Sequence, residues 1–138
     1  EEVSATGAIF VQDGIQDTTL TYLNFKGNVH AHIYVSWLHP FKEQRLVVIG
    51  DKAMMVFEDT LSENKLQYFK KGFEIIDGLP VKKDADFENI DFDNTQPLEI
   101  EQSHFADCIK NNITPRTDGE NAIEVLETLE RAQKDMIK

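Results

Sequence analysis

The sequence of 138 residues contains a single cysteine, Cys108, so no disulfide can form within the chain. Such sparse use of thiols is typical of a reducing compartment, and we expect a cytoplasmic protein. No apolar run approaches the ~18 residues of a membrane-spanning helix, and we expect no membrane segment. The first residues lack the basic start and apolar stretch of a signal peptide. Residue 1 is not an initiator Met, so we expect the chain to be part of a longer protein.

Basic residues are also scarce, with 14 Lys and Arg against 25 Asp and Glu and a formal net charge of −11. Nucleic acid is therefore not an expected partner, because phosphate neutralisation needs clustered Lys and Arg. Much of the acidity lies in residues 84–93 and in the last helical segment. Phe87, Ile90 and Phe92 interrupt the acidic run, and it lacks the spacing of a calcium loop. We predict a solvated loop there.

The motifs of common enzyme classes are absent as well. The sequence has no G-x-G-x-x-G, Walker A, H-E-x-x-H, C-x-x-C or G-x-S-x-G pattern. We therefore assign no catalytic residue. Cys108 lies on the apolar stripe of a predicted helix and is interpreted as a structural thiol. His30 and His32 lie two residues apart on one strand but lack a third ligand, so no metal site is predicted.

Regular alternation is the strongest signal that the sequence does contain. Between residues 29 and 37, apolar side chains from Val29 to Trp37 alternate with polar and aromatic ones, the pattern of a half-buried strand. Further strands are expected at 3–11 (with Gly7 as a bulge or a close contact), 18–25, 45–50, 53–57 and 66–75, and a short one near Val81.

The register of one hairpin follows from this alternation. A three-residue loop at 26–28 places Phe25 opposite Val29 and Leu23 opposite Ala31, which makes one face consistently apolar. A two-residue loop would move Leu23 and Phe25 to the other face. That other face, which we call the aromatic face, carries Leu20, Tyr22, His30, His32 and Tyr34.

The period changes to that of a helix from Pro97, and Asn111-Asn112 and then Pro115 end this first helix. Thr117 and Glu120 form a capping box that opens a second helix. Strands first and helices last predict an α+β fold. We expect one domain over residues 1–138, with an open, mostly antiparallel (mixed) sheet of about six strands and two C-terminal helices packed on one face.

Two surfaces of this fold are candidates for function. With both helices on the other side, the aromatic face lies uncovered, and we predict that it forms a homodimer or higher oligomer. The corner at residues 36–42 carries Trp37, His39 and Lys42, which are predicted to contact substrate because loops at sheet ends often bind ligands. The alternatives are a core position for Trp37 and solvated positions for His39 and Lys42. His104 is interpreted as structural.

Several stretches occur in the order found in one enzyme family. They are residues 23–29 (LNFKGNV), 36–42 (SWLHPFK), 48–54 (VIGDKAM), 97–105 (PLEIEQSHF) and 117–122 (TDGENA), followed by Val125-Leu126. Together they resemble the C-terminal domain of the glucose–fructose oxidoreductase / inositol dehydrogenase family (Gfo/Idh/MocA). The S-W-L-x-P-x-K form is most similar to the branch that acts on nucleotide sugars.

The resemblance implies a role in the transfer of a hydride between a nicotinamide, NAD or NADP, and a sugar or cyclitol carbon. In that family an N-terminal Rossmann domain holds the cofactor and the catalytic groups, and none of these parts lies in this chain. The chain would then wall the pocket of a small-molecule sugar substrate and build the oligomer. By itself it is expected to have no dehydrogenase activity.

Two other interpretations stay open at this stage. The first is a freestanding dimerisation module without an enzymatic parent. A glycine-rich turn after a strand and a Glu-Lys-Pro encoded upstream would distinguish the enzyme domain from it. The second is a small cone-shaped domain in which His30, His32 and Tyr34 line a closed polar cavity.

Overall fold

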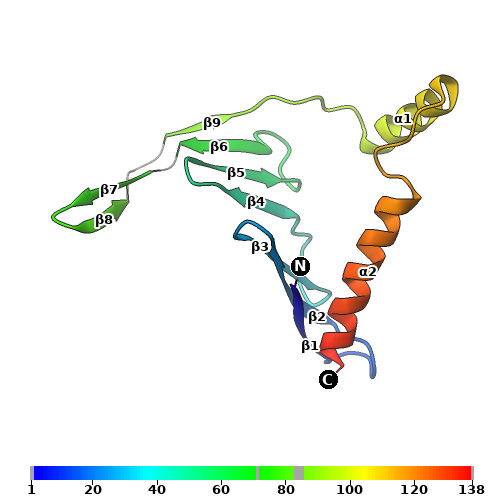
Figure 1. Ribbon diagram of the computed structural model, residues 1–138, viewed down its shortest axis with the longest axis horizontal. Helices are drawn as coiled ribbons and strands as arrows, with labels where there is room; N and C mark the ends of the chain where they lie inside the picture. The colour runs from blue at the N-terminus through cyan, green and yellow to red at the C-terminus, as the bar shows by residue number, and fades with distance from the viewer. Residues whose placement is uncertain (1, 71, 83–85, 138) are drawn as a thin grey trace. The chain divides into compact units, whose positions relative to one another are not determined.

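The chain folds as an α+β protein in a computed structural model that describes residues 2–70, 72–82 and 86–137 (Figure 1). The described strands are β1 (Glu2–Ala8), β2 (Thr18–Phe25), β3 (Val29–Ser36), β4 (Arg45–Ile49), β5 (Ala53–Glu58), β6 (Leu66–Lys70), β7 (Phe73–Ile76), β8 (Leu79–Lys82) and β9 (Phe87–Asn89). The helices are α1 (Pro97–Asn111) and α2 (Gly119–Met136). The predicted fold class is confirmed.

The described strands form three antiparallel sheets, in the orders β1-β2-β3, β4-β5-β6-β9 and β7-β8. The predicted antiparallel pairing is confirmed. The prediction of one sheet of about six strands is only approximate, because the described strands divide among three sheets. The prediction of one continuous strand over residues 66–75 is wrong. β6 ends at Lys70 and β7 begins at Phe73, and each pairs with different strands. Alternation along a chain does not reveal such a change of partner. The short strand near Val81 is confirmed as β8.

The contacts divide the chain into two compact units. The first contains the residues up to His39 together with those from Gln96 onward, and the second is Pro40–Thr95. The first unit therefore holds β1, β2, β3 and both helices, and the second holds the remaining strands. The single domain expected over residues 1–138 stays a prediction.

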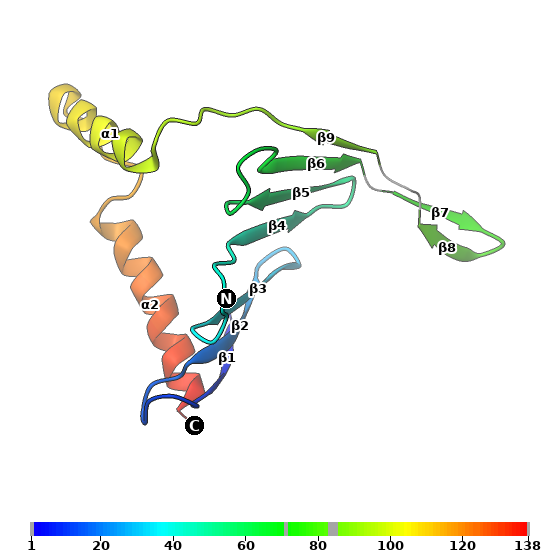
Figure 2. The same ribbon diagram turned by 180° about the vertical axis from the view of Figure 1, so that it is seen from behind.

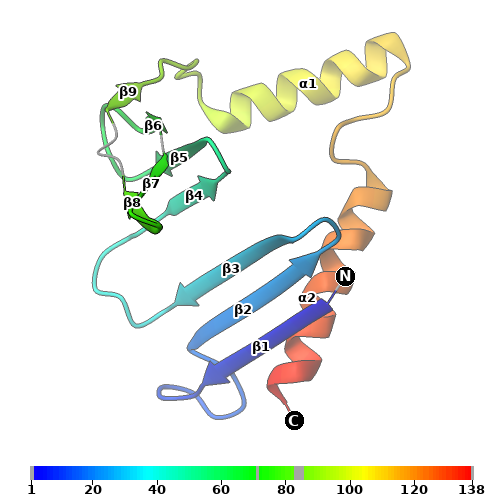
Figure 3. The ribbon, with the colours of Figure 1, turned by 60° about the vertical axis from the view of Figure 1, so that its left-hand side comes forward.

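The hairpin of β2 and β3 has the predicted register, with Phe25 opposite Val29 and Leu23 opposite Ala31. Its loop contains Gly27 at φ 79° and Asn28 at φ 60°. Glycine and asparagine tolerate this left-handed region better than other residues, so the loop has the residues that its geometry requires. Figure 3 shows β1, β2 and β3 side by side.

The end of α2 packs against the first strand. Ala132 of α2 and Leu23 of β2 are buried, and the backbone N–H of Ala5 donates a 2.9 Å hydrogen bond to the Asp135 carboxylate. In Figure 3 the helix lies behind this sheet. The apolar side of the β2–β3 hairpin is thus the side on which α2 lies.

Gly7 allows β1 to come close to its neighbours. A Cβ added there would lie 2.6 Å from Gln16 Cγ and 3.1 Å from Met136 Sδ. The close contact predicted at Gly7 is confirmed, although β1 ends at Ala8 rather than at Val11.

α1 begins and ends as predicted, with Pro97 in its first turn and Asn112 as a left-handed C-cap. Its apolar stripe is not covered, because Leu98, Phe105 and Ile109 are 63%, 61% and 67% exposed. Among the described residues of the first unit, α1 makes no extensive contact with α2 or with β1, β2 and β3. Packing on one face of the sheet is therefore observed for α2 and not for α1. An amphipathic pattern shows that a helix needs cover, but not which surface provides it.

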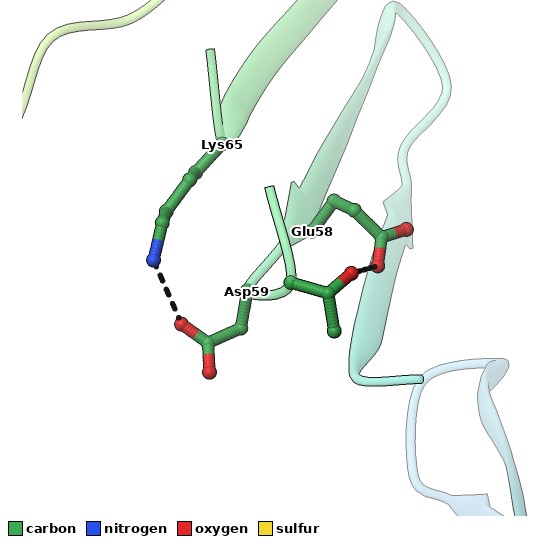
Figure 4. Close-up of polar contacts among 4 residues, drawn as sticks. Glu58, Asp59 and Lys65 are labelled. Carbon is green, nitrogen blue, oxygen red and sulfur yellow. Dashed lines mark hydrogen bonds and ion pairs between the residues drawn. The ribbon is translucent and has the colours of Figure 1, made fainter. Parts of the chain in front are cut away.

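The second unit is fastened by polar contacts between neighbouring strands and turns. At the β5–β6 turn, Lys65 lies 3.2 Å from Asp59, and Thr60 donates a 2.8 Å hydrogen bond to Glu58 (Figure 4). Val56 of β5 is buried in this unit. The turn is thus held by its own side chains.

The acidic stretch predicted as a loop is partly a strand. Residues 83–85 lie outside the described residues, but Phe87–Asn89 forms β9 and pairs with β6. Lys70 of β6 lies 3.2 Å from Glu88, and this hydrogen-bonded carboxylate raises the pKa of the Lys70 ammonium. Hydrogen bonds from Thr95 lower the pKa of Asp93. In both cases the contact stabilises the charged form, which raises the pKa of an ammonium and lowers that of a carboxylate.

The capping box predicted at the start of α2 is wrong by one residue. The N-cap is Asp118, whose carboxylate accepts a 2.9 Å hydrogen bond from the backbone N–H of Asn121. Thr117 and Asp118 are both good N-caps, and the sequence pattern does not decide between neighbours.

We expect Asp118→Ala to lower the free energy of unfolding by about 1 kcal/mol, because a backbone donor at the start of α2 loses its acceptor. The matched control Thr117→Ala should change it by less than about 0.5 kcal/mol. Chemical denaturation followed by circular dichroism measures both. If Thr117→Ala lowered the free energy of unfolding more than Asp118→Ala, Thr117 would be the N-cap, as in the predicted capping box.

Candidate functional site

The aromatic face is assembled as predicted. Antiparallel pairing of β2 and β3 places Leu20 opposite Tyr34, Tyr22 opposite His32 and Asn24 opposite His30. Because side chains alternate between the two faces of a sheet, all of these project to one side. Most of them are exposed in the chain. The placement is confirmed, and the role of the face in assembly stays a prediction.

Tyr22 is the centre of this face. Its ring stacks at 5.7 Å and 17° on His30 and lies 5.2 Å from His32. The Tyr22 hydroxyl lies 2.6 Å from His30 Nδ1, and His30 Nε2 lies 3.2 Å from Asn28 Oδ1. An amide oxygen only accepts, so Nε2 carries the hydrogen and Nδ1 accepts from Tyr22. The two contacts therefore select one neutral tautomer of His30.

A shallow hollow lies at the other end of the same sheet. Its volume is about 220 Å³, and it is lined by Thr6, Gly7, Ala8, Thr18, Thr19, Leu20 and Tyr34. The Tyr34 ring lies 5.9 Å from that of His39. His30, His32 and Tyr34 are exposed rather than enclosed, so the closed polar cavity considered from the sequence is wrong.

The corner after β3 contains the residues predicted to contact substrate. Trp37 is 88% exposed, so its alternative position in a core is wrong. Its backbone N–H is held by a 2.8 Å hydrogen bond to the Asp17 carbonyl. His39 belongs to the first unit, and the exposed Lys42 to the second. Substrate contact by these three residues stays a prediction.

Asp17 has a structural role that no sequence motif indicates. It is buried, and one carboxylate oxygen accepts hydrogen bonds from the backbone N–H groups of Phe10 and Val11. Together with its backbone bonds to Ala8 and Trp37, Asp17 fixes the loop between β1 and β2 and the start of the corner. Asp is common in turns, so its presence before a strand did not distinguish it.

His104 and Cys108 form a contact inside the first unit. Cys108 is buried, and its Sγ lies 3.6 Å from His104 Nε2. The same ring nitrogen accepts a 3.1 Å hydrogen bond from the backbone N–H of Arg116. Both residues thus hold the chain that follows α1, in agreement with their structural interpretation.

Within residues 2–70, 72–82 and 86–137, no three or more His, Cys, Asp or Glu side chains gather as metal ligands would. Among the helices of these described ranges, none is both long and apolar enough to cross a bilayer. No glycine-rich turn after a strand is available to hold a dinucleotide. The side chains of the aromatic face and of the corner can stack on a ring and donate hydrogen bonds.

We expect Tyr22→Phe to weaken the preference of His30 for its Nε2–H tautomer, because Nδ1 loses its donor while the contact of Nε2 with Asn28 remains. Nitrogen chemical shifts of the imidazole, measured by NMR at a pH where the ring is neutral, report the tautomer. The control Tyr34→Phe keeps the Tyr22 hydroxyl and should leave His30 unchanged. An unaltered tautomer population in Tyr22→Phe would contradict the assigned hydrogen bond.

Comparison with known proteins gives one similarity. A family model described as the GFO/IDH/MocA C-terminal domain matches residues 1–56, which contain β1 to β4 and most of β5. No curated protein matches, and neither does any solved structure. The family is in general one of NAD(P)-dependent oxidoreductases, and its C-terminal domain implies an N-terminal partner domain in the parent protein. The match supports the resemblance found in the sequence: this part of the chain is similar to a domain of an oxidoreductase.

Proposed function

We propose that the chain is the C-terminal domain of a cytoplasmic NAD- or NADP-dependent oxidoreductase of the GFO/IDH/MocA family that acts on a sugar or nucleotide sugar. The observation that carries the proposal is the family-model match over residues 1–56. That segment contains the aromatic face and the corner with Trp37, His39 and Lys42.

The chain supplies only part of such a reaction. Hydride transfer needs a nicotinamide against the reacting carbon and an acid–base group for the hydroxyl proton. Since this chain has no dinucleotide cradle, we assign both to an N-terminal Rossmann domain of a longer protein.

The corner would contribute binding and orientation. Trp37 presents a broad apolar ring to solvent, on which one face of a sugar can stack. Lys42 carries a charge that can pair with the diphosphate of a nucleotide sugar. His39, beside Tyr34, adds a nitrogen able to donate or accept a hydrogen bond. These roles orient a substrate and transfer no proton.

The aromatic face would join two copies of the domain. Tyr and His side chains are amphipathic, and an exposed patch of them is typical of a protein interface. The patch lies on one face of a sheet, so a second copy can meet it through the same surface and form a two-fold dimer.

We expect Tyr34→Glu to raise the dimer dissociation constant by roughly tenfold or more, because it places two carboxylates at a contact that excludes water. Sedimentation velocity measures this constant. The control Ile75→Glu adds the same charge at an exposed position of β7, which should leave assembly unchanged. If both variants raised the dissociation constant equally, or if the wild-type chain stayed monomeric, the proposal that the aromatic face forms the dimer interface would be wrong.

In the longer protein we expect Lys42→Ala to raise KM for a nucleotide sugar by roughly tenfold with a smaller fall in kcat, because a charge-assisted contact is lost. Steady-state assays that follow nicotinamide absorbance measure both constants. The control Lys52→Ala removes an exposed charge from the β4–β5 turn.

An unchanged KM in Lys42→Ala would remove Lys42 from the pocket. Oxidation of a nucleotide sugar with NAD or NADP by the present chain alone would contradict the assignment of cofactor binding and catalysis to an N-terminal domain. A chain that dimerises, with no nicotinamide-binding domain encoded upstream, would favour the freestanding dimerisation module.

A further inference from the structure

A pocket in the second unit has mostly polar walls. It lies between the β5–β6 turn and the chain that follows β9 (Figure 2), and its volume is about 280 Å³. Two short segments line it, residues 62–65 and residues 89–94. Apart from Lys65, its polar lining residues are Ser62, Glu63, Asn64, Asn89, Asp91 and Asn94. Both segments belong to one compact unit, so the pocket is complete within it.

The side chains of these six residues, which we call the free polar set, have no polar partner. Within the described ranges, none of the six side chains makes a hydrogen bond or an ion pair. Each of the three amides offers two donor hydrogens and one acceptor oxygen, whereas the two carboxylates only accept. The pocket therefore presents a group of donors and acceptors that the protein does not use for its own fold.

The walls of the pocket are fixed by other atoms. β9 pairs with β6, and the backbone N–H of Ile90 continues this pairing with a 2.8 Å hydrogen bond to the Leu66 carbonyl. On the turn side, the backbone N–H of Glu58 donates at 2.8 Å to the Lys65 carbonyl, and the Lys65 ammonium lies 3.2 Å from Asp59. The free polar set is thus carried by two anchored segments, which reduces the entropy lost when a ligand binds.

Two apolar side chains complete the lining. Ile90 and Phe92 are 37% and 41% exposed. The ring of Phe92 meets that of Phe57 edge-on at 6.0 Å, which holds it against β5. The pocket can therefore cover the C–H groups of a ligand while its polar residues meet the hydroxyl groups.

The charges of the lining disfavour an anion. Glu63 and Asp91 are both negative, and the one cation, Lys65, is already paired with Asp59. An anionic ligand would be repelled by the two carboxylates. An apolar ligand would leave amides and carboxylates without water or a partner.

A cation matches the lining less well than a neutral ligand. In the part of the chain that the structure describes, His, Cys, Asp and Glu side chains nowhere gather in threes as metal ligands would. An organic ammonium group would satisfy the carboxylates but not the amides. A hydroxyl group both donates and accepts, so it can pair with either kind of side chain. A molecule rich in hydroxyl groups uses the largest share of the free polar set.

We propose that this pocket binds a small uncharged polyol of about the size of a monosaccharide. Its volume is slightly below the roughly 300–1,000 Å³ of pockets for drug-sized ligands, which agrees with a small occupant. The site uses none of the residues assigned to substrate or assembly above, and it does not rest on the proposed function. It also lies outside residues 1–56, which the family model matches.

An NMR titration of the chain with glucose, and separately with sorbitol, tests this proposal. We expect at least one of the two to shift the side-chain amide signals of Asn64, Asn89 and Asn94 saturably, with a dissociation constant on the order of 1 mM. The side-chain amide of Gln133, an exposed residue of α2, is the internal control and should not shift.

Substitutions in the free polar set should weaken this binding. We expect Asp91→Ala to raise the dissociation constant roughly tenfold, and Asn89→Ala roughly fivefold, because each removes a hydrogen bond to a hydroxyl group. The matched control Asp51→Ala removes an exposed carboxylate from the β4–β5 turn and should leave binding unchanged. Since neither Asp91 nor Asn89 has a side-chain partner in the described ranges, the backbone spectrum should show that both variants stay folded.

The absence of a saturable shift with both polyols would overturn the proposal, and so would equal weakening by Asp91→Ala and Asp51→Ala. Glucose 6-phosphate that binds as tightly as glucose would contradict the charge argument. Saturable shifts with calcium chloride but with neither polyol would identify a cation site instead. These measurements use the chain alone and follow no dehydrogenase activity, so their outcome is separate from that of the proposed function.

Discussion

The pairing of β2 with β3 is the constraint on which the other features of the first unit depend. Side chains alternate with a period of two, so a slip of one residue would exchange the two faces of the hairpin. The left-handed Gly27 and Asn28 fix the loop length and hence the register. Tyr22 and both strand histidines consequently project to one side, while Leu23 and Ile33 project to the side where α2 lies. The aromatic face and the apolar face of the hairpin are both results of this one register.

Little of the chain's apolar surface is covered by the chain itself. Among the described residues, the buried apolar side chains are Leu23, Val56, Cys108 and Ala132. A domain of this length normally buries a much larger core. Exposed apolar side chains lie on the stripe of α1 and on the first sheet, and also along β4 and β7 of the second unit. This distribution is typical of a part that is completed by other parts, which agrees with its similarity to one domain of a larger oxidoreductase.

Sequence patterns predicted correctly those features that are formed by residues close together in the chain. The β2–β3 loop and the ends of α1 depend on residues close together in the chain, and they agree with the structure. The predictions failed where distant residues decide. The stretch over 66–75 changes pairing partner near Lys70, and Trp37 finds no core to enter. The prediction of the N-cap of α2 failed for a different reason, since Thr117 and Asp118 are adjacent and both residue types are favoured as caps.

The sequence by itself determined which side of each element is apolar, the α+β class and the family resemblance, because periodicity and short motifs are written in neighbouring residues. Only the tertiary structure decided that the strands divide among three sheets, that Tyr22 orients His30, and that α2 but not α1 lies against the first sheet. Apolar stripes are interchangeable in composition, so the surface that covers each one is chosen by shape and charge across contacts distant in the chain.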